Sequence, residues 1–494
     1  MLGALSINWP MPAFPESAAR ASVGLDQRVP MTSSIRVKLR EPARLRNLEL
    51  VLLLFAVALT LGSIALVQLG AVGALDSGAL TLYALLLVPL LVLHLTLRIT
   101  ASEADPLIVP IITLLNGLGV TMIYRIDLAN AQSGWESAGI RQIVWTAIAI
   151  VIATGVLIIV RNHRVLQRYR YIAMVSGIAL LVLPLAPIIG ATRNGARLWV
   201  EIGPLSFQPG ELGKVALAIF FAGYLVTARD SLSMVGRKFL GMQFPRARDL
   251  GPILVVFAAS MLVLVFQRDL GTALLYFGLF LVMLYVATGR SSWIVLGLGL
   301  FFVGAFVASR TLEYVGGRVS TWLDPFNPEN YDAVGGSYQL VQGLFGLADG
   351  GLIGTGLGRG SPEITPLSES DFIISALGEE LGLIGLFAIL GLYLLFVARG
   401  FRIGFAGHDD FGRLLGVGLA FVVALQVFVV IGGVTRVIPL TGLTTPFLAA
   451  GGSSLVANWI IAALLLRLSD TVRQQPRLVV DPIADDRSKQ GTSQ

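Results

Sequence analysis

Apolar runs of about 17–25 residues recur along this chain of 494 residues, and they restrict its fold more than any other feature. Each run is long enough to cross a hydrocarbon layer roughly 30 Å thick as a helix. Backbone groups in lipid must be paired internally, and the alternating pattern of barrel strands is absent, so the runs predict helices. We count twelve, at residues 49–69, 79–98, 107–124, 141–160, 171–190, 211–228, 251–267, 270–288, 292–309, 372–398, 414–435 and 446–467.

The composition excludes a soluble globular protein. Hydrophobic residues make up 55% of the chain and charged residues 13%, and the mean hydropathy is +0.79. In soluble domains about a quarter of the residues are charged. The sequence therefore predicts an all-α, polytopic integral membrane protein with about 12 transmembrane helices.

Basic residues gather at the ends of alternate runs and predict the orientation through the positive-inside rule. With twelve spans, every cluster falls on the cytoplasmic side, as do both termini. Residues 309–371 then form a large extracytoplasmic loop between spans 9 and 10. These clusters account for the net charge of +6, so nucleic-acid binding is disfavoured. They comprise Arg36, Lys38, Arg40, Arg44, Arg46, Arg161, Arg164, Arg168, Arg170, Arg229, Arg237, Lys238, Arg246, Arg248, Arg399, Arg402, Arg413, Arg467, Arg473 and Arg477.

The two ends of the chain are polar and predict disordered cytoplasmic segments at residues 1–47 and 469–494. The first of them lacks the short apolar core and cleavage site of a secretory signal. The chain has no cysteine, which excludes disulfides and thiolate metal sites. Only three histidines are present, so a zinc site built from histidines is disfavoured.

The polar segment before span 10 is the first place to look for chemistry. It holds eight acidic residues against three basic ones, and it ends at Asp371, where the next apolar run begins. A carboxylate at that boundary is partly dehydrated, which favours a raised pKa and a role as proton acceptor. The acids are Glu313, Asp324, Glu329, Asp332, Asp349, Glu363, Glu369 and Asp371.

Charged residues also lie at the start of span 6. Glu211 and Lys214 are one helical turn apart, after the helix-starting Pro209. One interpretation is a capped helix with a self-satisfied ion pair. The other is a polar outer cavity, formed with Arg197, that binds an anionic headgroup, because charges at the membrane edge are costly to keep.

Three further elements have a structural and a functional interpretation. Asp269, before span 8, either caps that helix or lines the same cavity. Glu379 and Glu380 lie roughly 12 Å along the helix beyond Asp371, either paired with neighbouring helices or lining a wet groove. The glycine-rich run 350–360 lacks the Gly-Lys-Ser/Thr ending of a phosphate loop, so a flexible loop or re-entrant turn is favoured.

In order along the chain, a set of motifs from about Asp105 to Arg467 resembles the SEDS family (shape, elongation, division and sporulation) of bacterial cell-wall polymerases, which includes RodA and FtsW. The motifs are Asn194-Gly195-Ala196-Arg197 with Trp199, Phe207-Gln208-Pro209 with Glu211 and Lys214, Asp269-Leu270-Gly271-Thr272, Trp322-Leu323-Asp324-Pro325, Asp371-Phe372-Ile373, Gly378-Glu379-Glu380-Leu381-Gly382, and Pro439, Gly442, Pro446-Phe447 and Gly451-Gly452-Ser453.

The resemblance implies a ten-helix core at residues 105–468, preceded by two additional helices at 48–104. The chain departs from the family pattern at several positions beside the motifs. Leu198 replaces a basic residue and Arg268 replaces a proline. Other departures are Gly210, Glu369-Ser370, Val430 and Ala449-Ala450.

The resemblance also implies an enzyme, a peptidoglycan glycosyltransferase that polymerises lipid II at the outer face of the bacterial cytoplasmic membrane, for cell-wall elongation or cell shape. Asp371 is the expected general base, acting in one direct displacement. Arg197, Lys214 or a divalent cation (Mg²⁺ or Mn²⁺) would stabilise the leaving pyrophosphate. The expected substrate cavity comprises Arg197, Trp199, Glu211, Lys214, Asp269, Arg318, Gln339, Glu379, Glu380 and Ser453.

Two other functions are weighed against the polymerase. A lipid II flippase should show inverted repeats and charges near the membrane midplane, whereas the charges here gather at outer helix ends. A scaffold that recruits cell-wall enzymes would not need Asp371. The resemblance also implies a partner, a class B penicillin-binding protein that acts as transpeptidase. We expect it to contact the loop after Ala308 and the outer ends of spans 8 and 9.

Overall fold

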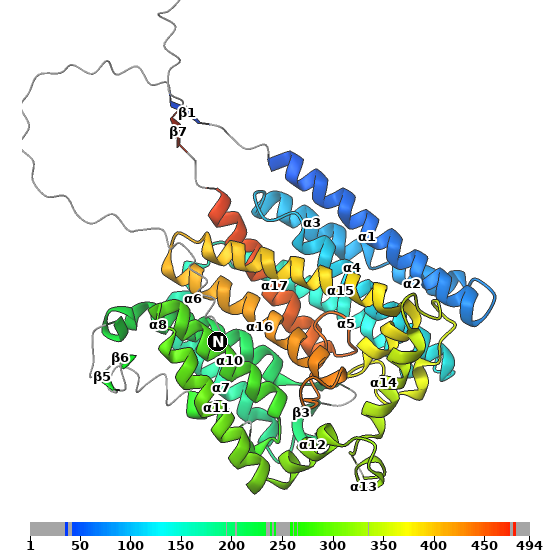
Figure 1. Ribbon diagram of the computed structural model, residues 1–494. Helices are drawn as coiled ribbons and strands as arrows, with labels where there is room; N and C mark the ends of the chain where they lie inside the picture. Colours follow the sequence, from blue (N-terminus) through cyan, green and yellow to red (C-terminus); the bar gives the residue numbers. More distant parts are fainter. Residues whose placement is uncertain are drawn as a thin grey trace, which may run out of the picture. The chain divides into compact units, whose positions relative to one another are not determined.

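The computed structural model describes residues 35–37, 42–193, 195–202, 205–233, 238–239, 242–243, 257–259, 261–263, 265–333, 335–474 and 478–480. Ten of the described helices are long and apolar enough to cross a membrane, which confirms a polytopic all-α membrane protein (Figure 1). Residues 251–256, 260 and 264 of predicted span 251–267, most of the two polar ends and the residues around Arg246 lie outside the described part.

The described helices follow the predicted apolar runs closely. The α-helices are α1 (Pro42–Ala71), α2 (Ser77–Ala84), α3 (Leu87–Thr100), α4 (Ile108–Ala129), α5 (Ala138–Ile159), α6 (Arg164–Arg168), α7 (Arg170–Val182), α8 (Pro209–Ser233), α10 (Leu270–Thr288), α11 (Ser292–Thr311), α12 (Glu313–Leu323), α13 (Pro328–Tyr331), α14 (Tyr338–Gly350), α15 (Ile373–Phe405), α16 (Asp410–Val434) and α17 (Gly452–Arg473). The second predicted span corresponds to α2 and α3 together.

Predicted span 171–190 is helical only in its first part. Helix α7 ends at Val182, a 3₁₀ turn follows at Leu183–Leu185, and the chain then enters strand β2. Pro184 and Pro187 lack the backbone N–H that an α-helix needs, which explains the early end. Predicted span 446–467 likewise begins late, at Gly452, because Pro446 and the two glycines before Ser453 favour an irregular backbone.

A small antiparallel sheet that the apolar pattern did not indicate lies between α7 and α8. It consists of β2 (Gly190–Arg193), β3 (Ala196–Ile202) and β4 (Leu205–Phe207), in that order. Trp199 pairs with Ala191, and Val200 pairs with Phe207. Gly195 has φ +77°, a conformation that favours glycine at the turn before β3. Two shorter pairs of strands are also described, β5 (Lys238–Phe239) with β6 (Met242–Gln243), and β1 (Ile35–Val37) with β7 (Leu478–Val480).

Helices α4, α16 and α17 form the interior of the unit at Arg40–Gln475. Most of each is buried, whereas α11 exposes nearly all of its apolar surface. Helix α17 packs against α5, and α15 packs against α16. An exposed apolar face on a membrane-spanning helix is suited to contact lipid or another helix.

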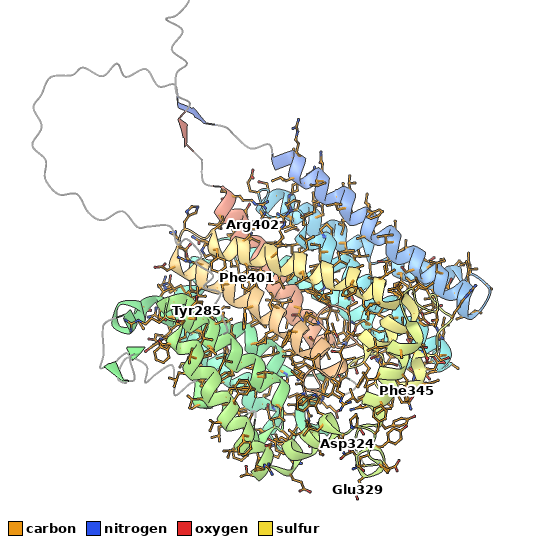
Figure 2. The ribbon with its side chains drawn as sticks, in the orientation of Figure 1. Tyr285, Asp324, Glu329, Phe345, Phe401 and Arg402 are labelled. Carbon is orange, nitrogen blue, oxygen red and sulfur yellow. The ribbon has the colours of Figure 1, made fainter. Side chains whose placement is uncertain are left out.

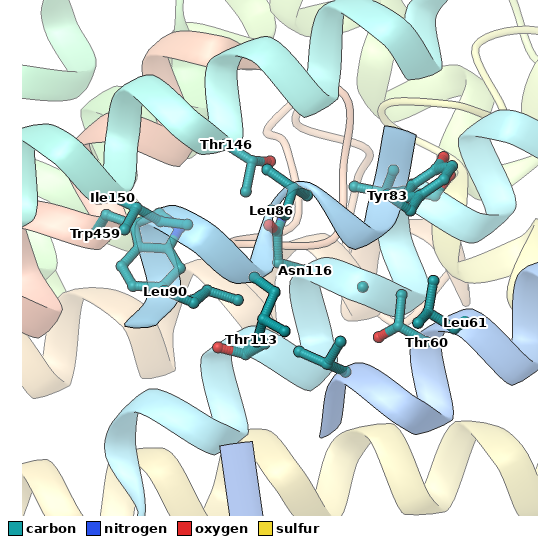
Figure 3. A pocket seen from close by; sticks show the side chains of 14 residues that line it. Thr60, Leu61, Tyr83, Leu86, Leu90, Thr113, Asn116, Thr146, Ile150 and Trp459 are labelled. Atoms are coloured by element: carbon teal, nitrogen blue, oxygen red, sulfur yellow. The ribbon is translucent and has the colours of Figure 1, made fainter. Parts of the chain in front are cut away.

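The N-terminal helices α1–α3 pack against this interior through α4 and α5. A cavity with about 450 Å³ of space not filled by atoms, part of it open to the surroundings, lies between the two groups of helices (Figure 3). Its wall is mostly apolar and includes Thr113, Asn116 and Trp459 from the interior. It is separate from the residues around Asp371.

The predicted polar loop at 309–371 is folded. It contains α12, α13 and α14 and a 3₁₀ turn at Pro362–Ile364. The glycine-rich run forms a turn in which Gly351, Gly354, Gly356 and Gly358 have positive φ. The apolar pattern did not indicate these short helices, because they carry fewer apolar residues than a membrane span.

Candidate functional site

An irregular segment at residues 435–451, between α16 and α17, organises the candidate site. Irregular backbone within a membrane protein requires partners from the surrounding protein. Several helices supply them here, because side chains from α4, α5, α15 and α16 donate to carbonyl oxygens of the segment. The pairs are Asn116 to Phe447 (3.0 Å), Gln142 to Ala449 (3.0 Å), Gln426 to Thr444 (2.8 Å) and Tyr393 to Pro446.

Asp371 lies against this segment, two residues before α15 begins. A β-carbon built on Gly442, which has φ +72°, would lie 3.7 Å from the Oδ2 atom of Asp371. The backbone N–H of Ala450 donates to the carbonyl of Glu369 at 2.8 Å. Two stretches far apart in the sequence therefore meet at the carboxylate.

The surroundings of Asp371 suit a proton acceptor. Burial raises the pKa of its carboxyl to about 6, while the nearby charge of Arg318 acts to lower the pKa and that of Glu369 to raise it. The residue still keeps part of its surface accessible. A carboxylate with such a pKa is ionised at neutral pH and is a stronger base than an ordinary aspartate.

The charge of Arg318 acts on two carboxylates of the site, Asp371 and Asp269. Its Nη1 donates to the carbonyl of Leu440 at 3.1 Å. Helix α12, which carries it, is tied to the irregular segment by a reciprocal pair: Trp322 Nε1 donates to the Arg436 carbonyl (3.1 Å) and Arg436 Nε to the Trp322 carbonyl (2.8 Å). These contacts fix Arg318 beside the site.

Glu211 and Lys214 form the predicted ion pair, with 2.6 Å between Oε2 and Nζ. Both side chains are buried. Lys214 also donates to Oε1 of Gln426 at 2.9 Å, and the amide nitrogen of Gln426 donates to Thr444. The pair is thus connected to the irregular segment through a glutamine that sequence reasoning missed. A single buried amide within the apolar run 414–435 was the signal for it.

Asp269 is the N-cap of α10, and its Oδ1 accepts from the backbone N–H of Thr272 at 2.9 Å. Burial raises its pKa above the ordinary value, against these hydrogen bonds. The charges of Glu211 and Arg318 also act on it. Asp269 therefore both caps its helix and lies with the other charges of the site.

Ser453 and Arg197 connect the ends of neighbouring elements. The Oγ of Ser453 accepts from the backbone N–H of Gln208 at 2.8 Å, which joins the start of α17 to the start of α8. Arg197, on β3, donates through Nη2 to the carbonyl of Ala186 at 3.1 Å. Its Nε is buried and has no hydrogen-bond partner among the described residues. Trp199 follows on the same strand and is partly exposed.

Glu379 and Glu380 contact the glycine-rich turn. Glu380 accepts from Nε of Arg125 at 2.9 Å and from the N–H of Gly358 at 2.8 Å. Glu379 accepts from the N–H of Ser361. These contacts correspond to the interpretation in which Glu379 and Glu380 are paired with neighbouring elements. Arg125 on α4 is a partner that the sequence did not indicate. Gln339 lies in the first turn of α14, partly exposed.

The described residues contain no group of three or more His, Cys, Asp or Glu side chains arranged to hold a metal ion. Glu211 and Asp269, two carboxylates of the expected substrate cavity, accept hydrogen bonds from Lys214 and Thr272. As placed, the two carboxylates do not form a cation site. The proposed mechanism therefore uses only side chains of the chain.

The fold and the carboxylate at the helix entry define a multi-pass membrane protein with a polar site at one end of its helices. The family model of the FtsW/RodA/SpoVE cell cycle proteins matches residues 106–474. The chain therefore belongs to the FtsW/RodA/SpoVE family, which the motifs indicated, and it is a protein of the bacterial membrane.

Individual relatives of the chain carry names from the same family. Peptidoglycan glycosyltransferase RodA of Mycobacterium tuberculosis is 45% identical over 439 residues, covering 87% of this chain and 92% of that protein. Residues 106–494 make up less than 87% of the chain. The matched stretch must therefore also include residues before 106, in the N-terminal helices. Stage V sporulation protein E of Bacillus subtilis is 32% identical and covers 74% of this chain and 97% of its own length.

Solved structures show the same fold. One of them has the description "Structural coordination of polymerization and crosslinking by a peptidoglycan synthase complex". It has a TM-score of 0.60 at 27% identity, and the match covers 75% of this chain and 99% of that one. The crystal structure of the rod shape determining protein RodA of Thermus thermophilus has a TM-score of 0.53 at 26% identity, covering 75% of this chain and 98% of that one.

Proposed function

We propose that this chain is a peptidoglycan glycosyltransferase that polymerises lipid II, with Asp371 as the general base. Relatives at 45% identity carry the name of this activity, which favours the enzyme over the lipid II flippase. The observation that supports the role of Asp371 is its position: a partly exposed carboxylate with a pKa of about 6, against Gly442 of the irregular segment.

The reaction joins a hydroxyl oxygen of the acceptor sugar to the anomeric carbon of the donor. As this bond forms, the bond from the anomeric carbon to the pyrophosphate oxygen breaks, and the configuration inverts. Asp371 takes the hydroxyl proton. The departing pyrophosphate carries developing negative charge, which a fixed cation stabilises. The cations that suit this role are Arg318, beside Asp371, and Arg197, whose buried Nε has no hydrogen-bond partner in the described part of the chain.

Lys214 has a different role in this proposal. Its ammonium lies between Glu211 and Gln426, so it holds α8 and α16 against the irregular segment. Glu211 and Asp269 shape the same region rather than carry the proton. Ser453 joins the starts of α8 and α17.

The test is glycan-chain formation from purified lipid II by the chain with its co-purified partner. We expect polymer from the wild type and a rate at least about a hundredfold lower from Asp371→Asn, since general-base catalysis contributes about that much. Asp332→Asn is the matched control, because Asp332 is an exposed carboxylate in the same inter-helix segment.

Equal rates for Asp371→Asn and wild type would place the base elsewhere, and Glu211 would be tested next. If the wild type makes no polymer while lipid II crosses the membrane of vesicles that contain it, the flippase is supported instead.

The site faces the outside of the cell in this proposal, and both termini lie in the cytoplasm. The contacts support two distinct ends. Asp105 pairs with Arg473 (2.6 Å) and Arg399 (3.4 Å), and Asp409 pairs with His163 (2.9 Å), so basic helix ends gather together. In Figure 2, Arg402 lies at the end of the molecule opposite Asp324 and Glu329.

A transpeptidase of the class B penicillin-binding type is the proposed partner. Support comes from the related solved complex, whose description joins polymerisation to cross-linking. Outside the spans, Leu323 and Phe326, at the end of α12 and just after it, are 62% and 59% exposed. Large apolar side chains exposed to water mark interaction sites, so this turn is the proposed contact.

A further inference from the structure

The end of helix α1 contacts the glycine-rich turn through backbone atoms. A β-carbon on Gly70 would lie 2.3 Å from the carbonyl oxygen of Leu357 and 3.2 Å from the Cα of Gly358. A β-carbon on Gly358 would lie 2.5 Å from the carbonyl oxygen of Val67 and 2.9 Å from the nitrogen of Ala71. Only glycine at both positions allows this approach, and Gly358 also has φ +80°.

The other side of the same turn is held by α15. The N–H groups of Thr355 and Gly356 donate to the backbone carbonyls of Glu379 and Glu380, each at 3.0 Å, and Gly358 donates to the Glu380 carboxylate. Where the turn inserts, α15 is interrupted at Gly382, whose φ is +67°. The turn therefore lies between α1 and the first part of α15, the helix that begins just after Asp371.

Helix α1 is itself fixed along its length. At its first turns, buried Arg46 and Glu49 pair at 2.5 Å, and Glu49 contacts Nδ1 of His94 at 2.7 Å. Arg46 also donates to the carbonyl of Ala104, in the linker to α4. Farther along, Thr60 packs closely on Gly117 of α4. These contacts set the register that brings Gly70 level with Gly358.

We propose that α1 is a positioning element of the site, and that its contact at Gly70 fixes the glycine-rich turn and, through it, the segment that ends at Asp371. This inference rests on the proposed function for its effect on the reaction. It gives the N-terminal helices a role beyond that of an added membrane anchor. The match with mycobacterial RodA, which extends into these helices, agrees with such a role.

The test compares the same substitutions at two glycines of α1. Nothing lies within 4 Å of a β-carbon built on Gly62, so Gly62→Ala and Gly62→Leu are matched controls for Gly70→Ala and Gly70→Leu. Alanine is a better helix former than glycine, so a helix-propensity effect would not destabilise either position. A steric effect at Gly70 would act on the turn, because the nearest atoms to its β-carbon belong to Leu357 and Gly358.

Two readouts are needed, on full-length protein in lipid nanodiscs with its partner bound. The first is hydrogen exchange of residues 350–360, which we expect to be faster in both Gly70 variants and unchanged in the Gly62 variants. The second is lipid II polymerisation. We expect kcat to fall at least tenfold in Gly70→Leu with KM within twofold, and both values to stay within twofold in Gly62→Leu.

Exchange or kcat of Gly70→Leu equal to that of Gly62→Leu would overturn the inference. Partner binding and the thermal midpoint identify any variant that fails to fold, in which case Gly70→Ala decides the result. If the wild type makes no polymer, the proposed function is contradicted. The hydrogen-exchange data still show whether α1 orders the turn.

Discussion

At the scale of single residues, Asp371 acquires its properties from neighbours in different parts of the chain. Burial raises its pKa, Arg318 on α12 opposes that rise, and Glu369 adds to it. Glu369, a position where the motifs predict a departure from the family pattern, therefore acts directly on the proposed base.

The pH dependence of polymerisation follows from these charges. The base must be ionised, so activity is lost as the pH falls through about 6. Glu369→Gln removes a repelling charge, lowers the pKa of Asp371, and moves the acid limb to lower pH. Arg318→Gln removes an attracting charge and moves the limb to higher pH. The measurement is kcat/KM against pH for both variants, because the pH profile of this ratio reports the pKa of the free enzyme.

Glu329→Gln is the control for the pH profiles, because Glu329 is an exposed carboxylate outside the site. If the acid limbs of the pH profiles of Glu369→Gln and Arg318→Gln move in the same direction, or do not move, Asp371 is not the titrating group.

At the scale of elements, the segment between α11 and α15 both positions Arg318 and carries the proposed partner contact. Helix α12 carries Arg318 on the side that faces the site, and it is held there by Trp322 and Arg436. Its end and the following turn expose Leu323 and Phe326. A partner bound at that turn would therefore touch the element that places the site's arginine.

Substitution on this turn should separate partner binding from folding. We expect the double variant Leu323→Glu with Phe326→Glu to lose most of its complex with the transpeptidase, because charge is introduced where apolar surface would be buried. Co-purification measures the loss. Ile188→Glu is the control, since Ile188 is an exposed apolar residue on a different segment, 94% accessible. Unchanged recovery of the complex would exclude this turn as the contact.

At the scale of the whole molecule, the helices place basic residues at one end and the candidate site at the other. The starts of α8, α10, α15 and α17 and the end of α16 all lie at the site. The ion pairs of Asp105 and Asp409 lie at the ends that carry the arginines. This separation is what the positive-inside rule requires of a protein with an outward-facing site.

Labelling of single cysteines tests the orientation directly, since the natural chain contains no cysteine. In intact cells, a membrane-impermeant thiol reagent should label Asp324→Cys and should leave Arg402→Cys unlabelled until the membrane is opened. The reverse pattern would place the site in the cytoplasm. Labelling of both in intact cells would contradict a single orientation.

The sequence by itself determined the features that local physics controls. Apolar runs predicted the membrane helices, because a backbone in lipid must satisfy its own hydrogen bonds. Helical spacing predicted the pair of Glu211 and Lys214, and the polar-to-apolar boundary marked Asp371. The small sheet after α7 and the short helices α12–α14 were not predicted, because tertiary contacts rather than apolar runs specify them.

The tertiary structure alone decided how the site is assembled. Asn116 reaches Phe447, Arg125 reaches Glu380, and Lys214 reaches Gln426, although each pair is separated by more than two hundred residues. No local pattern encodes such pairs. They exist because buried charges and irregular backbone at membrane depth both need polar partners, and only the packing of whole helices brings those partners within hydrogen-bonding distance.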